Sequence, residues 1–339
     1  MSVMLAAIAI TLLFCNWMFV KFIATNARSR TTAERLIHTD HTFASYSSDE
    51  LDLRLPLYTE THGLACVNVI RKPNTMHYAP YFGWNTQQLD LDCAKQHFAK
   101  QGTKILYFGG SAMENFEAPN YLTKIDHYVT TLNPTVVSLN LAESGGRSTN
   151  NMMRIMIEGI DLPSDYWIFL DGYNEFNSIK FNGNYKDDFY WTASVSDRIH
   201  HPIKFLFDKL IAKSKLTEKL FYGTGLVKNS RVRRTSISDE EINAAADYYV
   251  QNFKKINILC EAKKVQCVFL LQAYERSADP WSTRILDIGY ARILQQLGDK
   301  VIDLRPRFAD HTDAFVDDVH YNKKGSELVA TAIAEQISK

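Results

Sequence analysis

Residues 104–111 read KILYFGGS, a short apolar run that ends in two glycines and a serine. A strand that is apolar along its whole length is typical of a parallel sheet with helices on both faces. Four further runs share this character: residues 135–141 (TVVSLNL), 166–170 (YWIFL), 265–271 (VQCVFLL) and 301–304 (VIDL). Helical stretches separate the runs, so the sequence predicts an α/β protein with a central parallel sheet.

The helical stretches carry signals of their own. Residues 239–261 place apolar side chains on one stripe at helical spacing, and Ser238 with Glu241 forms a capping box in front of them. We expect another helix after Gly146 and a closing helix over residues 323–337. In sheets of this kind ligands bind beyond the carboxyl ends of the strands, so the residues that follow each strand are the candidates for function.

Three strand ends carry groups suited to acyl-transfer chemistry. Ser111 follows Gly109-Gly110 on a tight turn, with its hydroxyl exposed and its backbone N–H free to donate. Gly145 follows the second strand, and a glycine N–H can approach a ligand closely. Asn174 follows the third strand and can aim a side-chain amide at the same cleft. Together these three donors would form an oxyanion hole.

A late pair supplies the proton-transfer groups. Asp317 and His320 lie three residues apart, so within one turn their side chains are neighbours. The carboxylate can hold the imidazole Nδ1–H, which leaves Nε2 to take a proton from Ser111. The sequence therefore predicts Ser111 as nucleophile, His320 as base and Asp317 as the acid that orients the base.

These blocks resemble those of the SGNH (GDSL-like) hydrolase superfamily, which is named for its Ser, Gly, Asn and His. The matching residues are Gly109-Gly110-Ser111, residues 140–145 (NLAESG), Gly172-Tyr173-Asn174, and Asp317 to His320 with Asn322 and Gly325. The resemblance covers about residues 103–339. It implies the SGNH hydrolase fold, a flavodoxin-like three-layer α/β/α sandwich, and esterase, lipase or carbohydrate-deacetylase activity.

The resemblance has departures and close alternatives. The first block of the superfamily usually reads Gly-Asp-Ser, and Gly110 occupies the Asp position here, as in related membrane-anchored members. The residues around Ser111 lack the second glycine of the α/β-hydrolase nucleophile elbow, so we do not expect that fold. Asp318 competes with Asp317 for the carboxylate role, but the three-residue spacing favours Asp317. Glu175 is interpreted as structural.

The amino-terminal residues predict a membrane anchor. Residues 2–20 carry no charge, and as a helix they would cover about 28 Å, close to a hydrocarbon core of about 30 Å. A cleaved signal peptide is the closest alternative, but a basic leading region is missing and residues 25–27 make a poor cleavage site. We therefore expect a single-pass transmembrane helix over residues 1–24, so the membrane is an expected partner.

Two signals disagree about the side of the membrane. The basic residues that follow the span would leave the body in the cytoplasm. The cysteines favour an extracytoplasmic domain, since Cys66 with Cys93 and Cys260 with Cys267 could form two disulfides. Small buried thiols are an equally good interpretation of each pair. The orientation stays open at this point.

The remaining organisation follows from composition. Residues 25–54 are polar and without sustained periodicity, which indicates a stalk, and residues 55–102 are expected to form an N-terminal extension or cap. The hydrolase domain is expected over residues 103–339. The polar region 179–235 interrupts the alternation of strands and helices and is interpreted as an insertion.

The charge balance and histidine positions exclude some classes. Lysine plus arginine and aspartate plus glutamate both total 38, so no net field would draw the chain to nucleic acid. His38, His41 and His200-His201 lack convergent partners at metal-ligand spacing, so we expect no metal site and no cofactor.

The combined prediction is hydrolysis or transfer of a small acyl group through a covalent ester on Ser111. The anchor and the resemblance point to an O-acetylated envelope polysaccharide as the substrate, with proteins of such a polysaccharide system as candidate partners. Three alternatives stay open. They are a lipid-directed lysophospholipase or thioesterase, an acetyltransferase served by a partner protein, and a non-catalytic carbohydrate-binding or assembly module.

Overall fold

The computed structural model describes residues 66–69, 77–79, 83–85, 87–114, 124–143, 145–181, 236–276 and 279–338. All of these residues belong to one compact unit. The predicted anchor, the stalk and residues 182–235 of the predicted insertion lie outside the described residues. Among the described helices, none has the length and apolar character needed to span a bilayer.

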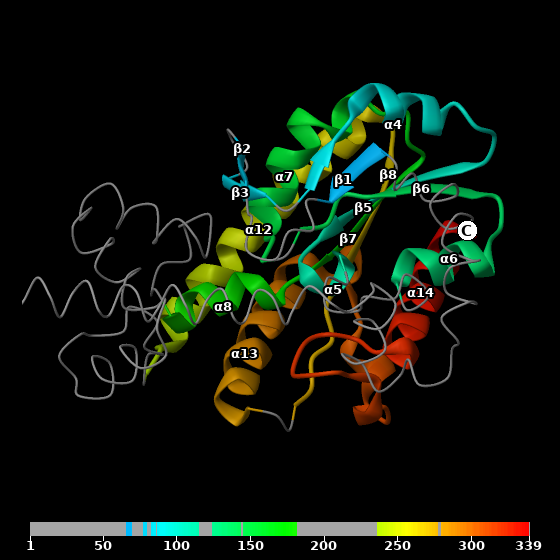
Figure 1. Ribbon diagram of the computed structural model, residues 1–339. Coiled ribbons are helices and arrows are strands. Elements are labelled where there is room, and N and C mark those ends of the chain that lie inside the picture. The colour runs from blue at the N-terminus through cyan, green and yellow to red at the C-terminus, as the bar shows by residue number, and fades with distance from the viewer. Residues whose placement is uncertain are drawn as a thin grey trace, which may run out of the picture. The chain divides into compact units, whose positions relative to one another are not determined.

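A five-stranded parallel sheet forms the centre of the described unit (Figure 1). Its strands are β5 (Thr103–Gly109), β6 (Val136–Asn140), β7 (Tyr166–Asp171), β8 (Gln266–Leu271) and β9 (Ile302–Asp303). They lie in the order β6-β5-β7-β8-β9, and every neighbouring pair is parallel. In chain order this is 2-1-3-4-5, the doubly wound flavodoxin-like arrangement. The predicted α/β class with a central parallel sheet is confirmed.

Helices cover both faces of the sheet, which gives three layers. One face carries α4 (Leu91–Phe98), α7 (Ser148–Ile157), α8 (Tyr173–Phe181), α12 (Asp239–Lys263) and α13 (Pro280–Leu297). The other carries α5 (Ser111–Glu114), α6 (Ile125–Leu132) and α14 (Lys323–Ile337). The described residues also form short 3-10 helices: η4 (Gly159–Asp161), η5 (Gly298–Lys300), η6 (Arg305–Phe308) and η7 (Thr312–Ala314).

The two faces explain why the strands are apolar throughout. Successive side chains of a strand point to opposite faces, so Leu106 and Phe108 lie in one core and Ile105 and Tyr107 in the other. All four are fully buried. The Phe108 and Phe169 rings stack with centroids 5.1 Å apart, which ties β5 to β7 in the first core.

Helix ends follow local chemistry. The predicted capping box forms at α12, because the Ser238 hydroxyl accepts from the Glu241 N–H at 3.2 Å and the Glu241 carboxylate accepts from the Ser238 N–H at 3.1 Å. The helix α13 was not predicted from the sequence. Its signals are present, since Asp279 caps its first turn, Pro280 opens it and Gly298 follows its last residue.

The predicted N-terminal extension belongs partly to the main core. In α4, Ala94 and Phe98 are buried with the strand side chains of the first face. Two antiparallel strand pairs precede and adjoin this helix: β1 (Val67–Val69) with β4 (Gln87–Leu89), and β2 (His77–Ala79) with β3 (Gly83–Asn85). Packing therefore continues across the boundary expected at residues 102 and 103. Similarly, α8 runs to Phe181, so the predicted insertion begins inside a helix of this unit.

Both cysteine pairs are disulfides in this structure. Cys66 bonds to Cys93 with a Cα–Cα distance of 5.2 Å, and Cys260 bonds to Cys267 with a Cα–Cα distance of 6.2 Å. The first joins the chain before β1 to α4, and the second joins the end of α12 to β8. The sequence left buried thiols and disulfides open as interpretations, and the structure has disulfides.

Candidate active site

The strand order reverses between β5 and β7, and ligands of doubly wound sheets bind beyond the carboxyl ends of the strands at such a point. Ser111 comes two residues after β5 as the first residue of α5. Asn174 lies in the first turn of α8, just after β7. The fold thus brings two of the predicted site residues to the edge where this class of sheet holds its ligands.

A continuous hydrogen-bonded chain joins three predicted residues across the sheet end. The His320 Nε2 atom lies 2.7 Å from the Ser111 Oγ atom. On the other side of the ring, His320 Nδ1 lies 2.6 Å from the Asp317 Oδ2 atom. Because a carboxylate only accepts, Nδ1 carries the proton and Nε2 is left as the acceptor for the serine hydroxyl.

Asp317 also organises the backbone that carries the histidine. Its Oδ1 atom accepts from the N–H groups of Val319 at 2.8 Å and His320 at 2.7 Å. Burial alone would raise the pKa of the Asp317 carboxyl, but the hydrogen bonds from His320 and Val319 outweigh burial and lower that pKa to about 2. The carboxylate is therefore ionised over the range in which a neutral imidazole can act as base.

Asp318, the rival for the carboxylate role, faces another partner. Its Oδ2 atom accepts from the Tyr173 hydroxyl at 2.7 Å, and its backbone oxygen accepts from the Glu275 N–H at 2.9 Å. Burial and this hydrogen bond raise the pKa of Tyr173 far above its ordinary value, so the phenol stays protonated. The structure brings Asp317, and not Asp318, to the imidazole of His320.

Gly110, which precedes Ser111, lies in close approach to the Asn174 side chain. A Cβ atom at Gly110 would collide with the side-chain amide of Asn174 and lie 3.2 Å from the Gly146 oxygen. The Asn174 amide itself donates to that oxygen at 2.9 Å. A side chain at position 110 would therefore have to displace the Asn174 amide.

The three predicted oxyanion donors are the N–H groups of Ser111 and Gly145 and the side-chain amide of Asn174. Gly145 has a φ of +76°, a conformation that favours glycine, and no described atom lies within 4 Å of the place where its Cβ would be. Within the described part of the chain, the N–H groups of Ser111 and Gly145 have no protein acceptor. An amide nitrogen carries two protons, so Asn174 keeps one after its bond to Gly146.

A buried carboxylate that the sequence analysis interpreted as structural ties two of these loops together. Glu175 accepts from the N–H of Ser148 at 2.5 Å and from the N–H of Gly172 at 3.2 Å. Burial, and then the charge of Glu175, raise the pKa of nearby Asp171 well above its ordinary value. The Asp171 oxygens accept from the Asn151 amide at 2.8 and 2.9 Å.

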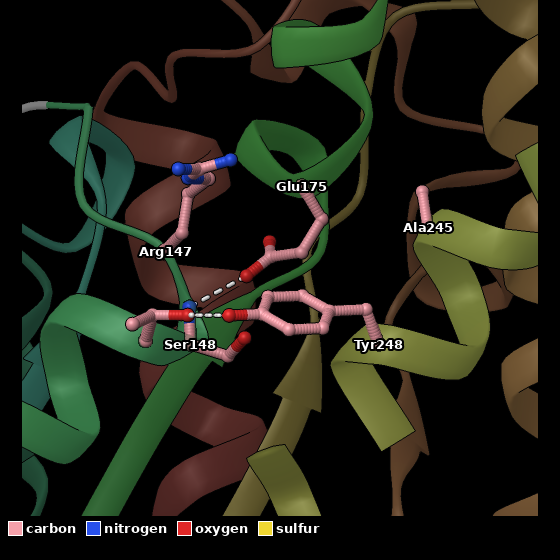
Figure 2. Close-up of a pocket in the computed structure, with 6 residues that line it drawn as sticks. Arg147, Ser148, Glu175, Ala245 and Tyr248 are labelled. Atoms are coloured by element: carbon pink, nitrogen blue, oxygen red, sulfur yellow. Dashed lines mark hydrogen bonds between the residues drawn. The ribbon is translucent and has the colours of Figure 1, made fainter. Parts of the chain in front are cut away.

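Figure 2 shows the Glu175–Ser148 hydrogen bond beside a shallow hollow. Its lining residues are Arg147, Ser148, Thr149, Glu175, Ala245 and Tyr248. A water-sized sphere does not fit inside it, and the Tyr248 and Thr149 hydroxyls lie 3.4 Å apart across it. The hollow is a packing feature between α7, α8 and α12, not a site for an acyl ligand.

Asn140, in the second block, joins α5, the helix that begins at Ser111, to the sheet. Its amide donates to the Met113 backbone oxygen at 2.9 Å, and its Oδ1 atom accepts from the Ala142 N–H at 3.1 Å. In the fourth block, the Asn322 side chain caps α14 by accepting from the Gly325 N–H at 3.2 Å. Within the described ranges, no group of three or more His, Cys, Asp or Glu side chains is placed to hold a metal ion.

The chain matches no family model and no curated protein. Solved structures similar to it include the acetyl xylan esterase AlAXEase, at 13% identity over 69% of this chain and 99% of that one, with a TM-score of 0.44. A member of the lipolytic protein G-D-S-L family from Veillonella parvula is 13% identical over 70% of this chain and 100% of that one, with a TM-score of 0.44.

The acetylxylan esterase Axe2 from Geobacillus stearothermophilus is also similar. It is 15% identical over 70% of this chain and 95% of that one, with a TM-score of 0.43. Likeness at this level assigns neither an activity nor a substrate, so the case for function depends on the geometry of the site.

Proposed function

We propose that this chain is a serine esterase of the SGNH type, which acts on a small acyl ester. The observation that carries the proposal is the hydrogen-bonded chain from Ser111 Oγ through both ring nitrogens of His320 to Asp317, with distances of 2.7 and 2.6 Å. Nucleophile, base and orienting carboxylate in this geometry are what acyl transfer to a serine requires.

In the first half of the reaction, the Ser111 oxygen attacks the carbonyl carbon of the ester while His320 Nε2 takes the hydroxyl proton. The N–H groups of Ser111 and Gly145 and the Asn174 amide receive the negative charge that develops on the carbonyl oxygen. His320 then gives its proton to the departing alcohol oxygen as the tetrahedral intermediate collapses. An acyl ester on Ser111 and a free alcohol result.

In the second half, a water molecule takes the place of the alcohol. His320 removes a proton from this water, the resulting oxygen attacks the acyl carbon, and the Ser111 oxygen leaves and recovers the proton from the imidazole. Asp317 remains ionised throughout and stabilises the imidazolium that forms in each half. The products are a carboxylic acid and the regenerated serine.

The direct test uses the full chain in detergent with p-nitrophenyl acetate and a fluorophosphonate probe. We expect wild-type turnover, covalent labelling, and a loss of about 10⁴-fold or more in kcat for Ser111→Ala, which also abolishes labelling. Ser164→Ala, at the amino end of β7, is the matched control and should retain both. No turnover and no labelling of the wild type would favour a non-catalytic carbohydrate-binding or assembly module.

The substrate proposed first is an O-acetylated envelope polysaccharide, an extension from the resemblance and the predicted anchor. A series of p-nitrophenyl esters from acetyl to long acyl chains tests it. Preference for acetyl supports the proposal, and preference for long chains favours a lysophospholipase or thioesterase. Acyl release that depends on an added sugar acceptor would instead indicate an acetyltransferase.

The proposed location is the extracytoplasmic side of a membrane, with residues 1–24 as the anchor. The disulfides Cys66–Cys93 and Cys260–Cys267 support it, since such bonds persist in oxidising compartments. Fusions of a periplasm-active and a cytoplasm-active reporter to the carboxyl terminus test this location. Activity of only the cytoplasmic reporter would contradict it.

A further inference from the structure

The residues that follow β8 hold the histidine loop at three points. The Gln272 side-chain amide donates to the Val319 backbone oxygen at 2.8 Å. The Tyr321 hydroxyl donates to the Ala273 oxygen at 3.0 Å, and the Glu275 N–H donates to the Asp318 oxygen at 2.9 Å. Ala273 and Glu275 make these contacts with backbone groups, whereas Gln272 makes its contact with its side chain.

The contact made by Gln272 falls at the centre of the triad's acid–base arm. Val319 lies between Asp317 and His320 in the chain, and its N–H donates to the Asp317 carboxylate at 2.8 Å. The Val319 carbonyl oxygen accepts from the Gln272 amide at the same time, so the peptide groups on both sides of Val319 are fixed. Because that oxygen can only accept, the atom of Gln272 facing it must be the amide nitrogen.

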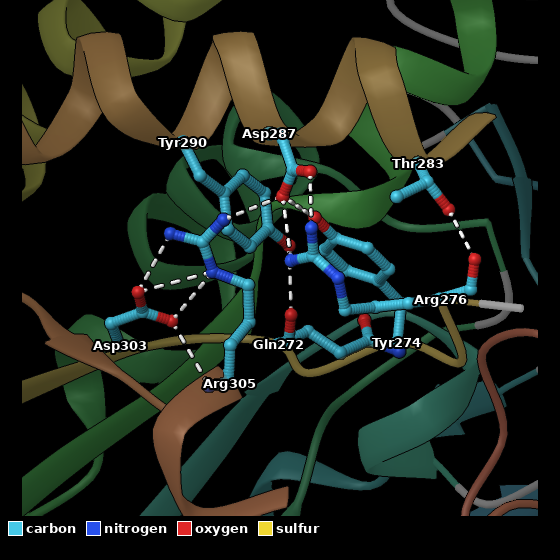
Figure 3. Close-up of polar contacts among 8 residues, drawn as sticks. All are labelled: Gln272, Tyr274, Arg276, Thr283, Asp287, Tyr290, Asp303 and Arg305. Atoms are coloured by element: carbon cyan, nitrogen blue, oxygen red, sulfur yellow. Dashed lines mark hydrogen bonds and ion pairs between the residues drawn. The ribbon is translucent and has the colours of Figure 1, made fainter. Parts of the chain in front are cut away.

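Gln272 is itself held in place by the sheet and by α13. Its backbone N–H donates to the Asp171 oxygen at 2.8 Å, which continues the pairing of β8 with β7. Its backbone oxygen accepts from the Tyr290 hydroxyl at 2.9 Å (Figure 3). Tyr290 is fully buried, and its hydroxyl fills the space that a Cβ at Gly172 would occupy.

Gln272 is buried, at 3% exposed, and its side-chain amide is directed to the histidine loop by the bond to the Val319 oxygen. On the outer side of Tyr290, the Arg305 guanidinium lies 4.9 Å above the ring and pairs with Asp303 and Asp287 (Figure 3). This arrangement fixes the ring that supports Gln272.

We propose that Gln272 is a positioning residue for His320, an inference that rests on the proposed esterase function. By holding the Val319 carbonyl, Gln272 keeps the imidazole at hydrogen-bonding distance from the Ser111 oxygen. The rate of proton transfer falls steeply when the base leaves this range, and a displacement of about 1 Å can lower the rate about 100-fold.

The first test replaces the amide without changing the size of the side chain. Gln272→Met in the full chain should lower kcat for p-nitrophenyl acetate by about 10- to 100-fold and leave KM within about 2-fold, since the loop does not bind the ester. Gln266→Met makes the same change at the exposed amino end of β8 and should leave both constants unchanged. A Gln272→Met enzyme with wild-type kcat would overturn the proposal.

A second variant covers the case in which Gln272→Met does not fold. Tyr290→Phe keeps the ring and removes only the bond to the Gln272 oxygen, so it should lower kcat by about 3- to 10-fold with KM unchanged. Unchanged kcat in a folded Tyr290→Phe protein, together with an unfolded Gln272→Met protein, would mean that Gln272 serves stability alone and would overturn the proposal.

A spectroscopic readout separates this inference from the esterase function. The proton between His320 Nδ1 and Asp317 should give a far-downfield NMR resonance, assigned by its loss in Asp317→Asn. We expect Gln272→Met to lose or broaden this resonance and Gln266→Met to keep it. Loss in Gln272→Met supports positioning even if the wild type turns over no ester, whereas an unchanged resonance contradicts positioning even if the wild type is an active esterase.

Discussion

The two halves of the site are built by different physical means. On the side of Ser111, backbone groups pack directly against one another. The Gly109 oxygen accepts from the Glu143 N–H at 3.0 Å, and a Cβ at Gly146 would lie 2.7 Å from that same oxygen. Around the base, side chains hold a loop by hydrogen bonds, and the Asp317 side chain remains 39% exposed.

The difference matches what the proposed reaction would require of each side. Oxyanion donors must be in place before charge develops, and backbone groups packed without spare volume do not have to reorganise. The proposed base would accept and return a proton twice in each cycle, and hydrogen bonds from Val319 and His320 offset the effect of burial on the Asp317 carboxylate that orients it. We therefore expect substitutions that add volume to be most harmful around Ser111, and substitutions that remove hydrogen bonds to be most harmful around His320.

The largest effect is expected at the orienting carboxylate. Asp317→Asn should lower kcat by about 10³- to 10⁴-fold, because an amide can hold the imidazole in the wrong tautomer. Asp318→Asn is the matched control, and it should cost less than about 10-fold since the new amide oxygen can still accept from Tyr173. Steady-state rates with p-nitrophenyl acetate decide, and equal losses in both variants would contradict the assignment of Asp317.

A smaller loss is expected at the oxyanion amide. Asn174→Ala should reduce kcat by about 10²- to 10³-fold with KM little changed, because the amide is proposed to act on charge that exists only in the transition state. Asn257→Ala removes an exposed amide on α12 that bonds to Glu261 and should leave the rate unchanged. If Asn174→Ala raised KM and spared kcat, Asn174 would be a ground-state contact instead.

Two substitutions compare volume with hydrogen bonding directly. Gly110→Ala should lower the free energy of unfolding by about 1 to 3 kcal/mol, because its Cβ must displace the Asn174 amide. Tyr173→Phe removes one hydrogen bond to Asp318 and should cost about 1 kcal/mol. Urea denaturation measures both, and a larger loss for Tyr173→Phe than for Gly110→Ala would reverse the comparison drawn above.

The smallest effect is a pH dependence of stability. Folding lowers the pKa of Asp317 from 3.8 to about 2, so its ionised form stabilises the native state. That contribution is complete above the unfolded pKa and is lost as the pH falls from 3.8 towards 2. The difference in unfolding free energy between wild type and Asp317→Asn should therefore shrink across this window. A difference that stays constant down to pH 2 would show that the carboxylate bonds add no stability.

Much of the fold, and the pairing of Asp317 with His320, could be predicted because the signals are local. The run at residues 104–108 needs only its apolar composition, and Asp317 with His320 needs only their spacing. The helix α13 was not predicted, although Asp279, Pro280 and Gly298 mark its ends.

Contacts between distant segments left no local signal. Gln272 reads as an ordinary polar residue after a strand, and its bond to Val319 joins positions 47 residues apart. Glu175 was interpreted as structural, but its two backbone donors, Ser148 and Gly172, could be known only from the packed α7 and α8. The close approach at Gly110 likewise depends on where Asn174 lies in space.

The bond between Cys66 and Cys93 has a consequence for proteolysis. These cysteines are 27 residues apart in sequence, so a protease that cuts once between them divides the polypeptide without separating its pieces. Whatever precedes Cys66 stays covalently attached to the half that carries Ser111 and His320. On a gel without reductant such a nicked chain would migrate as one species, and with reductant as two.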